Sequence, residues 1–180
     1  KLTGRVAEGY AKEIGLTAEA KGGRAGIRVN CPGDFSLWGP YEELRLLIEL
    51  PESYAAGFEA SSGSGDIVFS GPADPVKLTA GSGDIEVTDS TGLLELRAGS
   101  GDIVAKPAKI ARTSLRCGSG DIEFKAPPRG SFEYSAKSGS GDIVVEGRAT
   151  DSGAAQSGTI GGGGPEVQAQ TGSGDISIES

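Results

Sequence analysis

Apolar and polar residues alternate along most of the chain, in short runs separated by glycine-rich turns. Residues 85–87 read Ile-Glu-Val, and residues 94–98 read Leu-Glu-Leu-Arg-Ala. A period of two residues is typical of β-strands that bury one face and expose the other. The pattern therefore predicts an all-β protein built from short strands.

One pentapeptide, Gly-Ser-Gly-Asp-Ile, recurs six times, with its aspartates spaced by 18, 18, 19, 21 and 33 residues. An apolar run precedes each copy and another begins at its isoleucine, so each unit consists of two strands and two turns. The six aspartates are Asp66, Asp84, Asp102, Asp121, Asp142 and Asp175.

A unit of this length is too short for a strand–helix–strand crossover and fits one coil of a β-solenoid. The isoleucines then form a buried structural column. That column is Ile67, Ile85, Ile103, Ile122, Ile143 and Ile176.

The position four before each aspartate always carries a small residue, which suggests a tight corner where identical positions of successive coils stack on one another. These residues are Ser62, Ala80, Ala98, Cys117, Ser138 and Thr171. An antiparallel meander is the competing topology, but it needs similar turns at both ends, and the second turns differ.

The repeat suggests a single domain over residues 1–180, with each coil laid on the previous one. Residues 1–60 lack the motif but still alternate, so we expect irregular N-terminal coils and a cap there. Residues 61–180 form the repeat coils. The long interval before Asp175 contains Gly161–Gly164 and predicts a loop insertion at about residues 147–165.

Glycine accounts for 31 of the 180 residues, which could indicate either disorder or repeated turns. Twelve of these glycines belong to the six corners, so the repeat favours order. We expect glycine at the corners because other residues meet a penalty at positive φ.

The net charge of −8 argues against nucleic-acid binding, and the absence of histidine removes the commonest general base. No apolar run is long enough to span a membrane. The chain starts at Lys1 without any methionine, so we expect a processed form or fragment whose signal or anchor has been removed. Cys31 and Cys117 are expected to be unpaired. No catalytic constellation is found, so an enzyme is not predicted.

The aspartate column is the one constellation with possible chemistry. Stacked carboxylates repel each other, and two arrangements relieve this. Each carboxylate can accept backbone N–H bonds from its own turn, which we favour. Alternatively, calcium ions bridge successive turns, with Asp66, Asp84, Asp102, Asp121, Asp142 and Asp175 as weak candidate ligands. Calcium-binding β-rolls carry their motif at both corners, whereas this chain carries it at one.

The run 46–52 followed by 58–67, and the ending 161–167 followed by 171–176, resemble the toast-rack family of bacterial adhesin-like proteins over roughly residues 25–180. The resemblance implies a non-enzymatic, extracytoplasmic module at the cell envelope or surface, with a protein or glycan partner and without known catalytic residues. A self-assembling solenoid scaffold or filament, and hence a homo-oligomer, is the alternative. A calcium-binding β-roll-like domain is a third.

Overall fold

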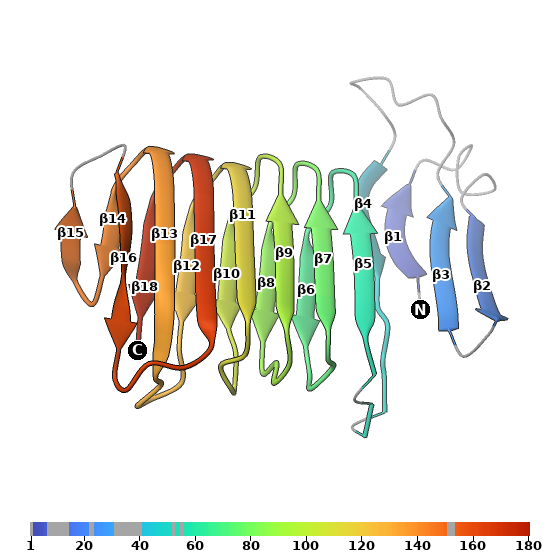
Figure 1. Ribbon diagram of the computed structural model, residues 1–180. Coiled ribbons are helices and arrows are strands. Elements are labelled where there is room, and N and C mark those ends of the chain that lie inside the picture. The colour runs from blue at the N-terminus through green and yellow to red at the C-terminus, as the bar shows by residue number, and fades with distance from the viewer. Residues whose placement is uncertain are drawn as a thin grey trace. The chain divides into compact units, whose positions relative to one another are not determined.

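The computed structural model describes residues 2–6, 15–21, 24–30, 41–51, 53–54, 56–150 and 154–180. Within these ranges every regular element is a β-strand (Figure 1), which confirms the all-β prediction. No helix in these ranges is long and apolar enough to cross a membrane. The chain divides into two compact units, Lys1–Leu50 and Pro51–Ser180, where the sequence suggested one domain.

The first unit contains two antiparallel strand pairs. β1 (Leu2–Val6) pairs with β4 (Tyr41–Leu46), and β2 (Gly15–Lys21) pairs with β3 (Arg24–Asn30). These pairs are antiparallel, unlike the parallel strands of the repeat coils, and the expectation of irregular N-terminal coils and a cap over residues 1–60 stays a prediction. Only two residues separate β2 from β3 in the sequence, which suits an antiparallel pair, whereas parallel strands need a long crossover.

The second unit contains two seven-stranded sheets, and each repeat coil gives one strand to each of them (Figure 1). Neighbouring repeat strands are parallel, which confirms the solenoid and excludes the meander. We call the sheets C and D. Sheet C runs β16 (Ala155–Ile160), β13 (Phe132–Ser140), β17 (Glu166–Ser173), β11 (Thr113–Ser119), β9 (Leu94–Ala98), β7 (Val76–Ala80), β5 (Phe58–Ser62). Sheet D runs β15 (Arg148–Thr150), β14 (Ile143–Val145), β18 (Ile176–Glu179), β12 (Ile122–Lys125), β10 (Ile103–Lys106), β8 (Ile85–Thr88), β6 (Ile67–Ser70).

The last coil does not follow the chain order that the sequence suggested. β17 pairs in parallel with both β11 and β13, and β18 pairs in parallel with both β12 and β14. The coil of β17 and β18 is therefore inserted between two earlier coils. The 33-residue interval between Asp142 and Asp175 supplies the chain length that this return requires.

The expected loop at residues 147–165 is largely replaced by strands. β15 pairs antiparallel with β14, and β16 pairs antiparallel with β13, so both strands lie at one end of the two sheets. Their small and polar side chains gave no strand signal in the sequence, because the pairing depends on a partner that is distant in the chain. Residues 161–165 remain a connection, and residues 151–153 lie outside the described part.

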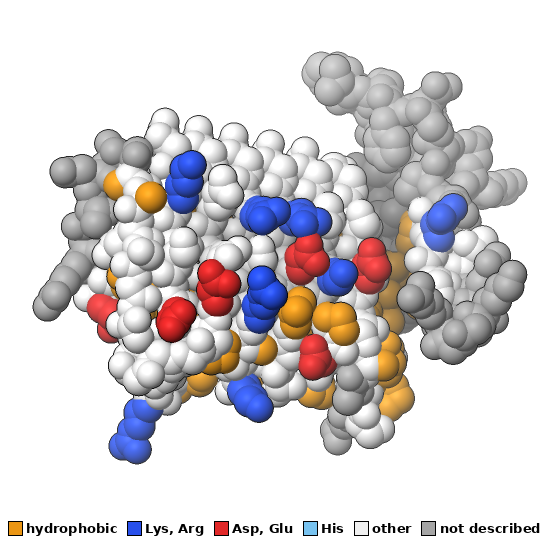
Figure 2. Space-filling model, viewed as in Figure 1, with side chains coloured by type: hydrophobic (Ala, Val, Ile, Leu, Met, Phe, Trp, Pro, Cys, Tyr) orange, Lys and Arg blue, Asp and Glu red, His pale blue; other side chains and the backbone are white. Residues whose placement is uncertain are grey.

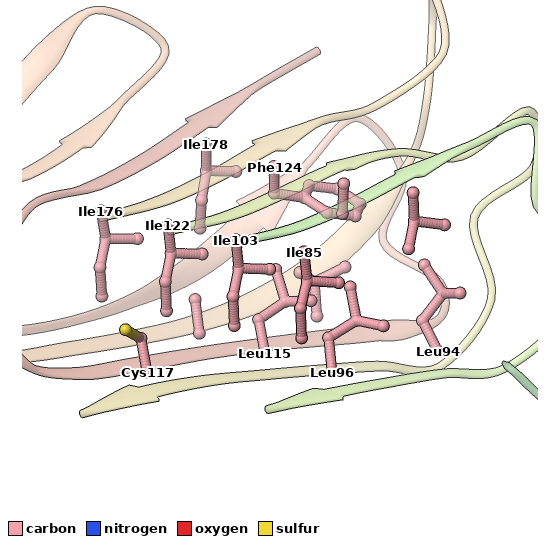
Figure 3. Packing of buried hydrophobic residues seen from close by; sticks show 14 of the residues in the cluster. Ile85, Leu94, Leu96, Ile103, Leu115, Cys117, Ile122, Phe124, Ile176 and Ile178 are labelled. Carbon is pink, nitrogen blue, oxygen red and sulfur yellow. The ribbon is translucent and has the colours of Figure 1, made fainter. Parts of the chain in front are cut away.

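The core lies between the two sheets and is built from ladders of like residues. Ile85, Ile103, Ile122 and Ile176 lie side by side in a row (Figure 3) and are at most 1% exposed. Ile143 is also buried, whereas the isoleucine of the first coil, Ile67, is half-buried. Burying one such side chain stabilises the fold by roughly 1.5–3 kcal/mol. The isoleucine column predicted from the sequence is therefore present.

Candidate functional site

The Gly-Ser-Gly-Asp corner connects the sheet C strand of each coil to its sheet D strand. Because the isoleucines that follow the aspartates are paired in register, the six aspartates lie in one exposed column along this corner. The order along the column follows the sheets and not the sequence. It is Asp66, Asp84, Asp102, Asp121, Asp175, Asp142.

Along this column, the backbone amide of each aspartate after the first donates a hydrogen bond to the side chain of the aspartate before it. The amide of Asp84 donates to Oδ1 of Asp66 at 2.9 Å, and the amide of Asp102 donates to Oδ1 of Asp84 at 2.8 Å. The same bond recurs at 2.8 Å in the remaining three steps, which join Asp121 to Asp102, Asp175 to Asp121, and Asp142 to Asp175. We call this series the aspartate ladder.

The aspartate ladder corrects the interpretation of the carboxylates. A carboxylate does accept a backbone N–H bond, but the donor belongs to the neighbouring coil and not to its own turn. A hydrogen bond to a charged group contributes about 1.5–3 kcal/mol. This contribution offsets the repulsion between neighbouring carboxylates, which is about 1 kcal/mol in water. The ladder therefore holds coil to coil.

The structure does not test whether the aspartate column binds calcium. In each carboxylate of the ladder that accepts an amide hydrogen bond, Oδ1 is the acceptor. The aspartate side chains are exposed. In the described part of the chain, no group of three or more His, Cys, Asp or Glu side chains is arranged to hold a metal ion. Calcium binding by the column stays the less favoured alternative, which experiment can test.

The corner glycines are required by close approach between coils. A Cβ on Gly81 would lie 2.2 Å from the carbonyl oxygen of Gly63, and one on Gly83 would lie 2.3 Å from that of Gly65. The expectation of positive φ holds at Gly141 and Gly174, both at +148°, whereas no other described corner glycine has a positive φ. Steric contact between stacked backbones is therefore the main reason for the repeated glycine.

The column of small residues also makes specific bonds, which sequence reasoning missed. The Cys117 thiol donates to the Gly101 carbonyl at 3.0 Å. The Thr171 hydroxyl donates to the Gly120 carbonyl at 2.9 Å, and the Ser138 hydroxyl donates to the Gly174 carbonyl at the same distance. The signal was present in the sequence, since these positions carry donors wherever they are not alanine.

Cys117 is buried and not in a disulfide, while Cys31 lies outside the described residues. Burial raises the pKa of the Cys117 thiol, and the nearby negative charges of Asp102 and Asp121 act in the same direction. Hydrogen bonds from Ser119 and Thr171 oppose this rise. The raised pKa favours the protonated form of the thiol, which is the less reactive one.

Beside the aspartate column, the outer surface of sheet D carries a shallow groove of about 540 Å³. Its lining includes Asp121, Glu123 and Glu179, and Lys125 lies 3.4 Å from Glu179 in an ion pair. The groove is rich in carboxylates and contains no nucleophile–base pair. It offers a polar, carboxylate-rich surface.

Comparison with known proteins gives one result. No curated protein and no solved structure matches the chain. The sequence model of the Toastrack DUF4097 family matches residues 55–179, a shorter span than the resemblance suggested. The match begins just before β5 and ends with β18, so it covers all the repeat coils. The chain belongs to the Toastrack DUF4097 family.

Proposed function

We propose that the protein is a non-enzymatic module of the bacterial cell envelope, an adhesin-like structural or binding domain outside the cytoplasm. The observation that carries this proposal is the aspartate ladder. The aspartate column, which was the constellation with possible chemistry in the sequence, joins the coils. Oδ1 of Asp84 and Oδ1 of Asp102 each accept a hydrogen bond from a backbone amide of the next coil. The repeat thus supports a stiff platform and not a reaction centre.

The surface available for a partner is the outer face of sheet C. Figure 2 shows positive and negative side chains interspersed on this side of the molecule. Glu95 lies 3.6 Å from Lys77 and also contacts Arg97 in an ion pair. Arg116 is paired in register with Arg97 on the neighbouring strand. A polar face with paired charges suits a protein or glycan partner that binds through hydrogen bonds and charge.

The experiment is co-sedimentation of the purified protein with bacterial sacculi and, separately, with envelope membranes. We expect binding by the wild type and weaker binding by the double variant Arg97→Gln/Arg116→Gln. The matched control is Lys106→Gln/Lys125→Gln, which removes the same charge from sheet D and should bind as the wild type does. Absence of binding to every envelope fraction would contradict the proposal, as would turnover in a glycan-cleavage screen.

A self-assembling scaffold is the second candidate, and the end strands of the two sheets favour it. β5 and β6 are the end strands of their sheets, so each has a neighbour on one side only within its sheet. Open strand edges are templates for pairing with another chain. Light scattering across a concentration series tests this candidate, and a monomer at every concentration would exclude it.

A further inference from the structure

The coil of β17 and β18 lies in a slot formed by two coils that both precede it in the chain. In sheet C, Gln168 is paired in register with Ser114 on one side and with Ser135 on the other. In sheet D, Ile176 lies in the same way between Ile122 and Ile143. The slot therefore presents a strand edge on both sides of both sheets.

The slot is selective for the corner motif. The amide of Asp175 donates to Oδ1 of Asp121, and Oδ1 of Asp175 accepts the amide of Asp142, both at 2.8 Å. A Cβ on Gly174 would lie 2.2 Å from the carbonyl oxygen of Gly120. A strand pair with a side chain in place of Gly174 would therefore collide with the neighbouring coil, and one without the Asp175 carboxylate would leave the amide of Asp142 without this acceptor.

The side chains that fill the slot are among the most deeply buried in the protein. They come from both strands of the inserted coil and alternate with outward-facing residues. Their exposures lie between 0 and 2% for Val167, Ala169, Thr171, Ile176 and Ile178. The inserted coil therefore supplies a continuous part of the core and joins the coils on either side of it.

The chain reaches the slot through a short glycine-rich connection. β16 pairs with one edge of β13 and β17 pairs with the other edge, so residues 161–165 pass across the end of β13 (Figure 1). The φ angles of Gly161, Gly163 and Gly164 are +62°, +80° and +147°. Glycine adopts such angles readily and also tolerates extended ones, so this connection can change direction.

We propose that the slot also accepts the β17–β18 coil of a second copy of this chain, so that two copies exchange their inserted coils. Both copies offer the same strands and the same corner, so the contacts inside the slot are identical in the exchanged and unexchanged forms. The two forms differ in the connection, which holds a chain's own coil at an effective concentration of roughly millimolar. Exchange is a low-cost route to a dimer, and its extent rises with protein concentration during folding.

The test uses chains of residues 1–180 in which Cys31 and Cys117 are replaced by serine. One chain carries Ser114→Cys and the other carries Gln168→Cys, two positions that are paired between β11 and β17. The chains are unfolded, mixed, refolded together over a range of concentrations and oxidised. Paired Cα atoms of neighbouring strands lie within the range that a disulfide spans. We expect a heterodimer joined by this disulfide, with a yield that rises with concentration.

The control is a mixture of Thr79→Cys and Arg97→Cys chains, which are paired between β7 and β9 and are not separated by the glycine connection. We expect a severalfold higher yield from the first mixture than from this control. Equal yields at every concentration overturn the proposal. The single-chain double variant Ser114→Cys/Gln168→Cys must form the disulfide internally, and its failure to do so overturns the inserted register itself.

A synthetic peptide of residues 165–180 with Gln168→Cys gives an independent readout that does not depend on the connection. Refolded in excess with the Ser114→Cys chain, it should be captured as a disulfide adduct. The same peptide with Gly172→Ala and Gly174→Ala should not be captured, because both new Cβ atoms would collide with carbonyl oxygens of the neighbouring coil. Equal capture of the two peptides overturns the proposed selectivity of the slot.

Discussion

The backbone amide of Asp102 donates a hydrogen bond of 2.8 Å to Oδ1 of Asp84, eighteen residues earlier in the chain. Oδ1 of Asp102 in turn accepts the amide of Asp121 at 2.8 Å. The same residue thus joins its coil to the coils on both sides, through its backbone amide on one side and its carboxylate on the other. This dual use makes the interior aspartates sensitive positions.

Replacing Asp102 by alanine should lower the free energy of unfolding by about 1–3 kcal/mol, because the amide of Asp121 loses its acceptor. Asp102→Asn keeps an oxygen at this position and should be less destabilising. Asp142→Ala is the matched control, since within the described residues no coil amide donates to the Asp142 carboxylate. Urea unfolding measures all three, and equal losses for Asp102→Ala and Asp142→Ala would contradict the role of the ladder.

Alanine at a corner glycine should have an effect that depends on its coil. A Cβ on Gly99 would lie 2.3 Å from the Gly81 carbonyl oxygen, whereas a Cβ on Gly63 would have no atom within 4 Å. Gly99→Ala should therefore cost at least about 1–3 kcal/mol of stability, as overpacking does. Gly63→Ala should be close to neutral in a thermal melt. Similar midpoints for the two variants would show that conformational freedom and not close approach explains the glycines.

The isoleucine column should show the same dependence on position. Ile122→Ala removes a side chain that is 1% exposed and should lower the free energy of unfolding by about 2–5 kcal/mol. Ile67→Ala affects a half-buried residue of the first coil and should cost less. Denaturant titration of both variants decides this, and a larger loss at Ile67 would argue against the described core.

Cys117 should contribute a pH dependence that serine lacks. Burial raises the pKa of the folded thiol, so its contribution to stability is complete below the unfolded pKa of about 8.5 and is lost as the pH rises through the folded pKa. Cys117→Ser keeps a donor for the Gly101 carbonyl and removes this titration. The stability of the wild type relative to the variant should fall as the pH rises from about 8 into the alkaline range. A constant difference over that range would refute the effect.

Calcium should leave the stability of the protein unchanged. The carboxylates of the aspartate column already accept amide hydrogen bonds through Oδ1, and these bonds hold the coils together without a metal. We expect the same midpoint of thermal unfolding in millimolar calcium and in chelator. A rise in the midpoint with calcium that is absent in Asp102→Asn/Asp121→Asn would establish a metal role for the column.

The coil and its buried faces could be predicted from the sequence because the information is local. The alternation of Leu94, Leu96 and Ala98 and the corner before Ile103 lie within one unit, and the same pattern repeats in the next. The burial of these residues follows directly from that alternation. Even the small column before the aspartates was visible, although its hydrogen bonds were not.

The order of the last coils could not be predicted in this way. The coil of residues 132–145 and the coil of residues 166–179 carry the same corner and the same alternation, so either suits the open edges of β11 and β12. The two coils differ in the contacts that they make with distant residues, such as that of Phe132 with Phe124, whose ring centroids lie 5.6 Å apart. Such contacts between distant residues have no signature in the spacing of a repeat.

The aspartate ladder also has a direction. Each internal coil presents one amide to the coil on one side and one carboxylate oxygen to the coil on the other, and this pair of groups is the same at Asp84, Asp102 and Asp121. A further unit of about 18 residues placed between two of these coils could form both bonds. Its aspartate amide would donate to the carboxylate on one side, and its carboxylate would accept the amide on the other, with no change to the neighbouring coils. Duplication or deletion of repeat units within the gene can therefore lengthen or shorten this protein by whole coils. The length of the stack of coils is therefore set by the number of repeat units, and evolution can change that number while the core residues within each coil stay the same.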